Sequence, residues 1–334
     1  MPQPKPVGDR FGTLRPIAAG LLGGGLAILI RVAVAHWHFA NDFDQLWVAA
    51  RALVQGDDPY TAVARARLNL GYPLYYPLPA VVLVLPLAAL PLAAARIAFA
   101  GICGFLAGYG LSRSGAHRLL ALASVPFLAS VLAGQLASAL TGAALIPALG
   151  FLLPAKPTVG LALWGAYPSR RSAVLAVGCI GLTVLLWPWW PEAWFQAIRA
   201  APHIRAPLLR PGGALLLLAA FRWRQPGGRL LALWACIPRT EGLYDLLPLF
   251  LVTRTASETA LLTVLSWLAL FTEAVLPGAS NPITDPVRAT ATTWLVLLTL
   301  LYLPALALVL RRPPSTKASP TGEAEEAEAA SRGS

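Results

Sequence analysis

The sequence predicts an all-α polytopic membrane protein. Hydrophobic residues make up 57% of its 334 residues and charged residues only 12%, about half of the roughly 25% that is usual in soluble domains. The mean hydropathy is +0.64. So few charged side chains cannot cover a soluble surface, and we therefore expect lipid to be the solvent for most of the chain.

The net charge of +11 does not indicate a nucleic-acid partner. Basic proteins often bind nucleic acid, but here the basic residues stand singly or in pairs between apolar segments, which is typical of topology signals. The cysteines Cys103, Cys179 and Cys236 are isolated in apolar runs. Their spacing excludes a disulfide scaffold and a zinc site, so we expect them to act as small hydrophobic residues.

The N-terminal segment is predicted to lie in the cytoplasm. Residues 1–15 carry Lys5, Arg10 and Arg15, and basic residues beside a span favour the cytoplasmic side. An apolar run over residues 16–35 follows. No small-residue cleavage site comes after it, which favours an uncleaved first span over a signal peptide.

Residues 36–91 form the predicted first extracytoplasmic loop. From Leu46 to Leu53, apolar residues recur at i, i+3, i+4 and i+7, the pattern of a surface helix. Asn41 or Asp42 would cap the start of this helix, and a Gly-Asp-Asp-Pro turn would end it. Aspartates are common in such turns for conformational reasons, so we assign no metal to this pair.

The later spans follow from the remaining apolar runs. Pro86 and Pro91 break the next run, which predicts a re-entrant or interfacial helix over residues 79–90 and then a span over 92–112. Residues 119–168 have room for two crossings or, tightly, for four. The other predicted spans are 172–189, 211–222, 229–240, 243–253, 258–277 and 289–310.

These spans describe a multi-pass protein of the cell membrane with both termini in the cytoplasm. About ten crossings of ~20 residues or fewer form one domain, residues 16–312. Residues 313–334 are rich in Pro, Ser, Thr, Ala and Glu and lack aromatic residues, which predicts a disordered cytoplasmic tail.

The predicted outer face carries more cations than the positive-inside rule leads us to expect. Ionisable groups at a membrane boundary are costly and usually have a function. An anionic ligand would explain them, and a lipid phosphate at the interface is the first candidate. The alternative is that these side chains only reach toward lipid headgroups. They include Arg51, Arg65, Arg67, Arg96, Arg199, Arg205, Arg210, Arg239 and Arg288.

One segment of the first loop carries a specific pattern. It reads Asp42-Phe43, then Leu46-Trp47, then Ala49-Ala50-Arg51-Ala52-Leu53, and ends in Gly56-x-Asp58-Pro59-Tyr60. This pattern resembles the bacterial polyprenol-phosphate-mannose-dependent α-1,2-mannosyltransferases of the GT-C superfamily of glycosyltransferases.

Further segments resemble the same family in the same order, so that the likeness extends over about residues 15–310. Two positions depart from the family pattern: Ile237 replaces the usual Ser, and Arg239 stands where His or Tyr is common. The matching segments are Tyr76-Pro77 with Pro79, Gly134-Gln135, Lys156-Pro157-Thr158, Pro191-Glu192 with Trp194, and Pro238 with Tyr244-Asp245.

The resemblance implies a GT-C-like helical bundle and an inverting sugar transfer. The donor is a polyprenyl-phosphate sugar, with mannose the expected sugar, and the acceptor is a glycolipid or glycan on the extracytoplasmic face of the bilayer. No cofactor and no metal are implied. One carboxylate takes the proton of the attacking hydroxyl, and cations stabilise the departing phosphate.

The resemblance also assigns roles to single residues. Asp42 matches the catalytic aspartate and is our general base, with Asp44 as second choice; the alternative for Asp42 is an N-cap that only starts the helix. The predicted ligands of the donor phosphate are Arg239, Lys156, Arg51 and His203. The predicted sugar- or acceptor-binding residues are Tyr244, Asp245, Gln135, Tyr76, Glu192 and Trp194.

A transporter or flippase of lipid-linked sugars is the competing hypothesis. Transporters place their ligand sites near the bilayer midplane, whereas this chain has its ionisable residues in predicted outer loops and at the ends of spans. A scaffold subunit is a third hypothesis, and it predicts that Asp42 tolerates substitution.

Overall fold

The computed structural model describes residues 10–35, 41–68, 72–199, 205–240, 242–276 and 291–312. Within these ranges the chain is helical, and an isolated antiparallel bridge joins Arg205 to Arg239. The predicted all-α class is therefore confirmed for the described residues. The predicted disordered tail over residues 313–334 lies outside them.

Among the described residues, four helices are long and apolar enough to cross a membrane. They are α1 (Arg10–Ala33), α5 (Leu92–Arg113), α12 (Ala256–Val275) and a helix over Thr292–Leu310. This last helix is built from α13 (Ala291–Leu297), a π-helical turn η11 (Leu298–Tyr302) and α14 (Leu303–Leu310). A membrane protein is the class that such helices indicate.

The predicted count of about ten crossings is not confirmed, because most other helices are short. α9 (Arg170–Leu186) and α10 (Trp190–Arg199) would supply a fifth span only if this pair, bent by 105°, crosses as one. The apolar helices over Leu78–Ala89, Gly213–Arg222 and Leu243–Val252 are shorter still. Helices shorter than ~20 residues cross a bilayer only where neighbours cover their ends.

The remaining helices are shorter than the four long ones. Pro86 lies at the start of η3, so the predicted break near residue 86 is present as a change from α-helix to 3₁₀-helix. These helices are α2 (Asp42–Gln55), α3 (Pro59–Ala66), α4 (Leu78–Val84), η3 (Leu85–Ala89), η4 (Ala116–Ala123), α6 (Val125–Leu132), α7 (Ala137–Ala143), η5 (Pro147–Ala155), α8 (Pro157–Ala166), η6 (Pro207–Leu209), η7 (Gly213–Arg222), α11 (Pro226–Cys236), η8 (Leu243–Asp245) and η9 (Leu247–Val252).

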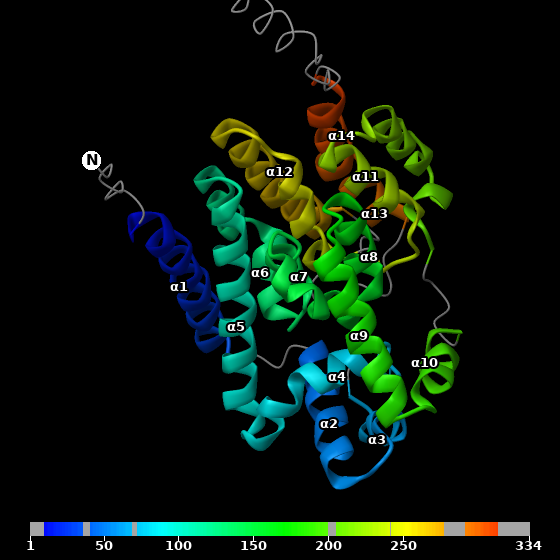
Figure 1. Cartoon of the computed structure of the whole chain (residues 1–334). Coiled ribbons are helices and arrows are strands. Elements are labelled where there is room, and N and C mark those ends of the chain that lie inside the picture. Colours follow the sequence, from blue (N-terminus) through cyan, green and yellow to red (C-terminus); the bar gives the residue numbers. More distant parts are fainter. Residues whose placement is uncertain are drawn as a thin grey trace, which may run out of the picture.

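Helices α1 and α5 lie side by side along the bundle (Figure 1). Their contact depends on glycine, because a Cβ atom at Gly23 would collide with the carbonyl of Gly104, and a Cβ atom at Gly108 would collide with that of Ala19. Such close backbone approach provides dispersion contact between helices in lipid, where the hydrophobic effect does not drive association.

Within the predicted first loop, the described residues form the predicted helix α2 and a second helix, α3. Helix α2 begins at Asp42, and its N-cap is Asn41, whose side chain accepts a hydrogen bond from the backbone N–H of Phe43 at 3.0 Å. Gly56 ends α2 in the left-handed conformation at φ 82°. Asp58 caps α3 by accepting from the N–H groups of Tyr60 and Thr61. The alternative that Asp42 is the cap of α2 is wrong.

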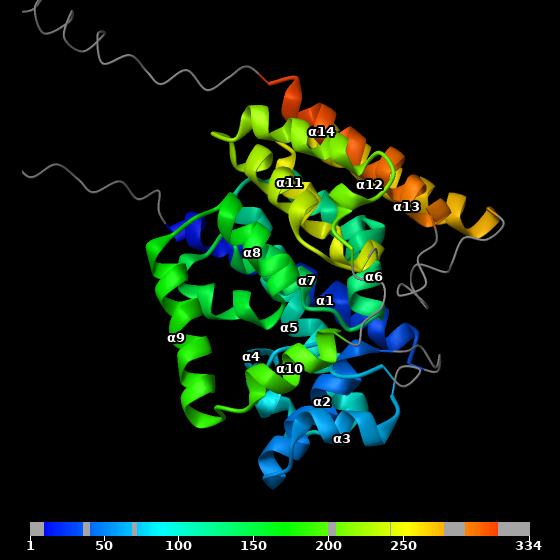
Figure 2. The ribbon, with the colours of Figure 1, turned by 90° about the vertical axis from the view of Figure 1, so that its right-hand side faces the viewer.

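Arginines close the end of the bundle that lies away from α2. Arg118 donates to the carbonyls of Leu251 and Thr253, and Arg312 donates to Val252 and pairs with Glu258. Carbonyls freed at the ends of short helices therefore find partners. The start of α1 and the end of α14 both lie toward this end, whereas α2, α3 and α10 lie at the other (Figures 1 and 2).

Candidate active site

The Asp42 carboxylate lies at the place where α2 meets the bundle. It belongs to the first residue of the helix and takes no part in the cap, which Asn41 provides. Its backbone N–H donates to the carbonyl of Ala133 at 2.9 Å. The loop between α6 and α7, which contains Ala133, is thereby fastened to the start of α2.

Gly134 and Gln135 bring that loop against the carboxylate. Gly134 has φ 63°, and a Cβ atom there would collide with the Oδ1 atom of Asn41, so glycine satisfies both the backbone conformation and the close packing. The Nε2 atom of the next residue, Gln135, donates a hydrogen bond to Oδ2 of Asp42. The Gly-Gln pair is thus one structural unit.

Gln135 connects Asp42 to two further predicted site residues. Its Oε1 atom lies 2.9 Å from the Tyr76 hydroxyl and 2.7 Å from Lys156 Nζ, and both groups donate to it. The Tyr76 hydroxyl also lies 3.4 Å from Oδ2 of Asp42. Gln135 is 2% exposed, so these contacts are formed in a site from which water is largely excluded.

Lys156 pairs with Asp245 on the other side of the cluster. Its Nζ atom lies 2.7 Å from Oδ1 of Asp245 and 4.9 Å from the centroid of the Tyr244 ring. The other carboxylate oxygen of Asp245, Oδ2, is buried and has no hydrogen-bond partner among the described residues. That oxygen is an acceptor available to a hydroxyl of a ligand.

Arg239 is buried, and its guanidinium forms no hydrogen bond within the described ranges. The residue is 1% exposed, its Nε, Nη1 and Nη2 atoms have no partner among the described residues, and its Cζ atom lies 3.9 Å from the centroid of the Trp234 ring. Stacking on an aromatic ring stabilises a cation but satisfies none of its donors. A buried guanidinium in this state is suited to an incoming anion.

Arg239 and Asp42 belong to the same neighbourhood. The phenol of Tyr244 lies within electrostatic range of Arg239, Asp42 and Asp245, and its hydroxyl is 3.0 Å from Oγ1 of Thr240. The structure therefore brings together residues from the first loop, the α6–α7 loop, the start of α8 and the segment before η8.

Burial raises the pKa of the Asp42 carboxyl above its ordinary value. Desolvation is the largest cause; the Lys156 charge and the Gln135 hydrogen bond oppose it, and the charge of Asp245 adds to it. A carboxylate with a raised pKa takes up a proton more readily at neutral pH. This is the property that a general base needs.

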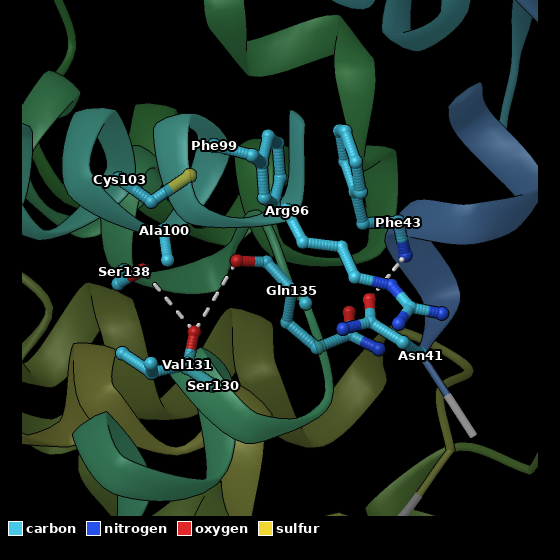
Figure 3. A pocket seen from close by; sticks show the side chains of 11 residues that line it. Asn41, Phe43, Arg96, Phe99, Ala100, Cys103, Ser130, Val131, Gln135 and Ser138 are labelled. Atoms are coloured by element: carbon cyan, nitrogen blue, oxygen red, sulfur yellow. Dashed lines mark hydrogen bonds between the residues drawn. The ribbon is translucent and has the colours of Figure 1, made fainter. Parts of the chain in front are cut away.

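Asp44 is held in a separate ion pair. Its oxygens accept from Nε of Arg96 at 2.7 Å and from Nη2 of Arg96 at 2.5 Å. Figure 3 shows Arg96 beside Asn41 and Phe43 in a narrow pocket that Gln135 also lines. Ser130 donates to the Gln135 carbonyl at 3.3 Å in this pocket, which fixes the backbone of the Gln135 loop.

The other predicted site residues lie in different surroundings. Arg51 is exposed, with its Cζ atom 4.8 Å from the Trp47 ring centroid. Glu192 is exposed on α10 and accepts from Gln196. Trp194 donates its indole N–H to the carbonyl of Tyr75 at 2.9 Å, so its position serves to fasten α10 to the first loop. His203 lies outside the described residues.

Two residues near the site were not predicted from the sequence. Trp234 forms the aromatic face beneath Arg239, and Arg96 neutralises Asp44. Trp234 precedes Arg239 by five residues. Helical periodicity does not extend from the end of α11 into the loop that follows, so the sequence pattern does not bring the two side chains together. Arg96 appeared only as one cation of many.

The chain has no match among the protein-family models, the curated proteins or the solved structures with which it was compared. The function must therefore be argued from the geometry of these residues.

Proposed function

We propose that the protein is a GT-C-like integral membrane glycosyltransferase that moves a sugar from a polyprenyl-phosphate donor to a glycolipid or glycan acceptor. Mannose is the sugar we expect. The proposal includes about ten membrane crossings by short and long helices, cytoplasmic termini and an extracytoplasmic site. The family resemblance of the sequence supports this proposal in addition to the geometry.

The observation that carries the proposal is a part-buried carboxylate, Asp42, and a buried guanidinium, Arg239, that has no hydrogen-bond partner among the described residues; both lie within electrostatic range of Tyr244. Asp42 supplies a carboxylate that does not cap α2, and Arg239 supplies donors that have no hydrogen-bond partner in the described part of the chain. An inverting transfer needs these two groups, a base for the acceptor and a cation for the leaving phosphate.

Asp42, Arg239 and Asp245 each have a separate role in the proposed transfer. The acceptor hydroxyl oxygen forms a bond to the anomeric carbon while the bond from that carbon to the phosphate oxygen breaks, and the hydroxyl proton passes to Asp42. The polyprenyl phosphate leaves with its bonding electron pair, and Arg239 stabilises the charge. Asp245 Oδ2 is placed to accept from a sugar hydroxyl. The products are the glycosylated acceptor and polyprenyl phosphate.

A carrier of lipid-linked sugars is the second candidate function. Glu273 favours it, because this residue lies within the long apolar helix α12, is 4% exposed and has no hydrogen-bond partner for either carboxylate oxygen among the described residues. Ionisable residues inside spans often mark transport pathways. A carrier moves the donor across the bilayer and leaves the sugar–phosphate bond intact.

A donor panel distinguishes these two functions. Purified protein in proteoliposomes is incubated with radiolabelled polyprenyl-phosphate sugars and a glycolipid extract, and the labelled products are separated. We expect one sugar to be transferred, and we expect Asp42→Asn to slow that transfer by about 10²- to 10⁴-fold. Asp57→Asn is the matched control, because Asp57 is exposed in the turn after α2. Full activity of Asp42→Asn, or movement of intact donor without transfer, contradicts the enzyme.

A further inference from the structure

The side-chain contacts of Gln135 are more than substrate binding or packing would require. Its side chain has one donor end and one acceptor end, and the structure uses both: Nε2 faces Asp42, and Oε1 faces Tyr76 and Lys156. A side-chain amide turned by 180° would exchange these two ends.

Lys156 decides which way the amide lies. An ammonium group has three donors and no acceptor, so only the oxygen end of Gln135 can face Lys156 at 2.7 Å. The donor end then faces Asp42, where it stabilises the carboxylate form. Asp245 in turn holds the ammonium at 2.7 Å from its Oδ1 atom. The order of contacts is therefore Asp245 to Lys156, to Gln135, to Asp42.

We propose that Gln135 and Lys156 are positioning residues of the Asp42 base: Lys156 fixes the orientation of the Gln135 amide, and the amide holds the carboxylate toward the acceptor. The role of Asp42 as base rests on the proposed function. This inference adds that Lys156, which the sequence assigns to the donor phosphate, acts through Gln135 on the base.

The charged and titratable groups that face Asp42 come from each element packed against it. Lys156 comes from the start of α8, Tyr76 from the segment before α4, and Tyr244 and Asp245 from η8. Lys156 and Gln135 lower the pKa of Asp42, whereas burial and Asp245 raise it. Loss of either positioning residue should therefore raise the pKa of Asp42, so that the carboxyl keeps its proton to a higher pH.

The test follows the protonation of Asp42 without using catalysis. Protein labelled with ¹³C-aspartate at the carboxyl carbon is titrated in nanodiscs, and the Asp42 resonance is the one that Asp42→Asn lacks. We expect Lys156→Met and Gln135→Leu each to raise the midpoint by about one pH unit or more. Lys156→Arg, which keeps charge and donors, should stay near the wild-type midpoint. Lys317→Met and Gln55→Leu are the matched controls.

A double variant keeps the test valid if Lys156→Met alone does not fold. Lys156→Met alone leaves Asp245 buried and uncompensated, which is destabilising, so Lys156→Met with Asp245→Asn is titrated in parallel. Lys156 exceeds Asp245 as a cause of the Asp42 shift, and we therefore expect the midpoint still to rise, by less. Midpoints unchanged in Gln135→Leu and in this double variant overturn the proposal.

Steady-state kinetics separate this proposal from the function on which it rests. In a transferring enzyme, Gln135→Leu should lower kcat by about 10- to 100-fold while the donor KM stays within about threefold, because a misplaced base affects the transition state only. A raised donor KM with unchanged kcat in Lys156→Met would make Lys156 a donor ligand and overturn its positioning role. Shifted midpoints without any transfer would retain the network and refute the glycosyltransferase.

Discussion

Asp42 and Asp44 are two residues apart in one helix, yet their carboxylates face different partners. Asp42 accepts from Gln135, and Asp44 accepts from Arg96 through both oxygens. Two residues turn an α-helix by about 200°, so the first carboxylate faces the polar cluster of the bundle and the second faces α5. Asp44 is thus held in an ion pair, whereas Asp42, the base of the proposed reaction, lies in the polar cluster.

Substitution of Asp44 should affect stability more than transfer. Asp44→Asn leaves Arg96 without its charged partner, which we expect to cost about 1–3 kcal/mol of unfolding free energy, seen as a lower melting temperature. Transfer by the folded fraction should stay within several-fold of the wild type. Loss of transfer as large as that of Asp42→Asn would move the base to Asp44.

Substitution of Arg239 should weaken the donor far more than the acceptor. A hydrogen bond to a charged group is worth about 1.5–3 kcal/mol, so Arg239→Ala should raise the donor KM by about 10- to 150-fold. Arg239→Lys keeps the charge but loses the planar set of donors and should lie between. Arg67→Ala is the control, because Arg67 is exposed at the end of α3. A donor titration that is unchanged in Arg239→Ala contradicts the phosphate assignment.

Transfer should decline as pH falls. The base must be ionised to accept a proton, and burial raises the pKa of Asp42, so the acidic limb of kcat/KM should lie above the ordinary aspartate value of about 4. The measurement is a pH profile with control for protein stability. An acidic limb at pH 4 or below would show that Asp42 is not the titrating base.

The same raised pKa has a consequence for stability. When a carboxyl holds its proton more tightly in the folded than in the unfolded state, the protein loses stability as pH rises through the folded-state pKa. At neutral pH, Asp42→Asn removes that penalty, so its melting temperature should equal or exceed that of the wild type. If Asp42→Asn melted below the wild type at pH 7 and above it at pH 4, the pKa of Asp42 would be lowered in the folded state, contrary to this prediction.

Substitution of Glu273 should stabilise the protein. The residue is buried in α12 and its carboxylate has no hydrogen-bond partner among the described residues, a state that costs about 1–3 kcal/mol. Glu273→Leu removes that cost, and Glu273→Gln keeps the shape with a polar group. If the protein is a transferase, sugar transfer should persist in both variants, measured beside the thermal melts. Loss of transfer in both would give Glu273 a functional role.

The orientation in the membrane can be tested by labelling. In a variant without the natural cysteines, Thr61→Cys in the first loop should react with an impermeant thiol reagent in intact cells, because Thr61 is exposed on α3. Ser169→Cys, before α9, should react only after permeabilisation. The opposite pattern would invert the proposed topology.

Much of the fold was predictable where the signal is local. The helix over Asp42–Gln55, its turn at Gly56 and the long helix Leu92–Arg113 follow from apolar period, caps and composition. The crossing count was not predictable in the same way. Between Pro147 and Ala166 the helices η5 and α8 are short and broken, and whether a short helix spans depends on which neighbours cover its ends.

The sequence by itself determined that the chain is helical and suited to lipid, and it supplied the residues on which the proposed sugar transfer rests. Only the tertiary structure decided that Asn41 caps α2, that Asp44 is neutralised by Arg96, that Lys156 meets Gln135 across a separation of 21 residues, and that Gln135 meets Asp42 across 93. The physical reason is that caps and periodicity act within a few residues, whereas buried charges choose their partners by distance in space.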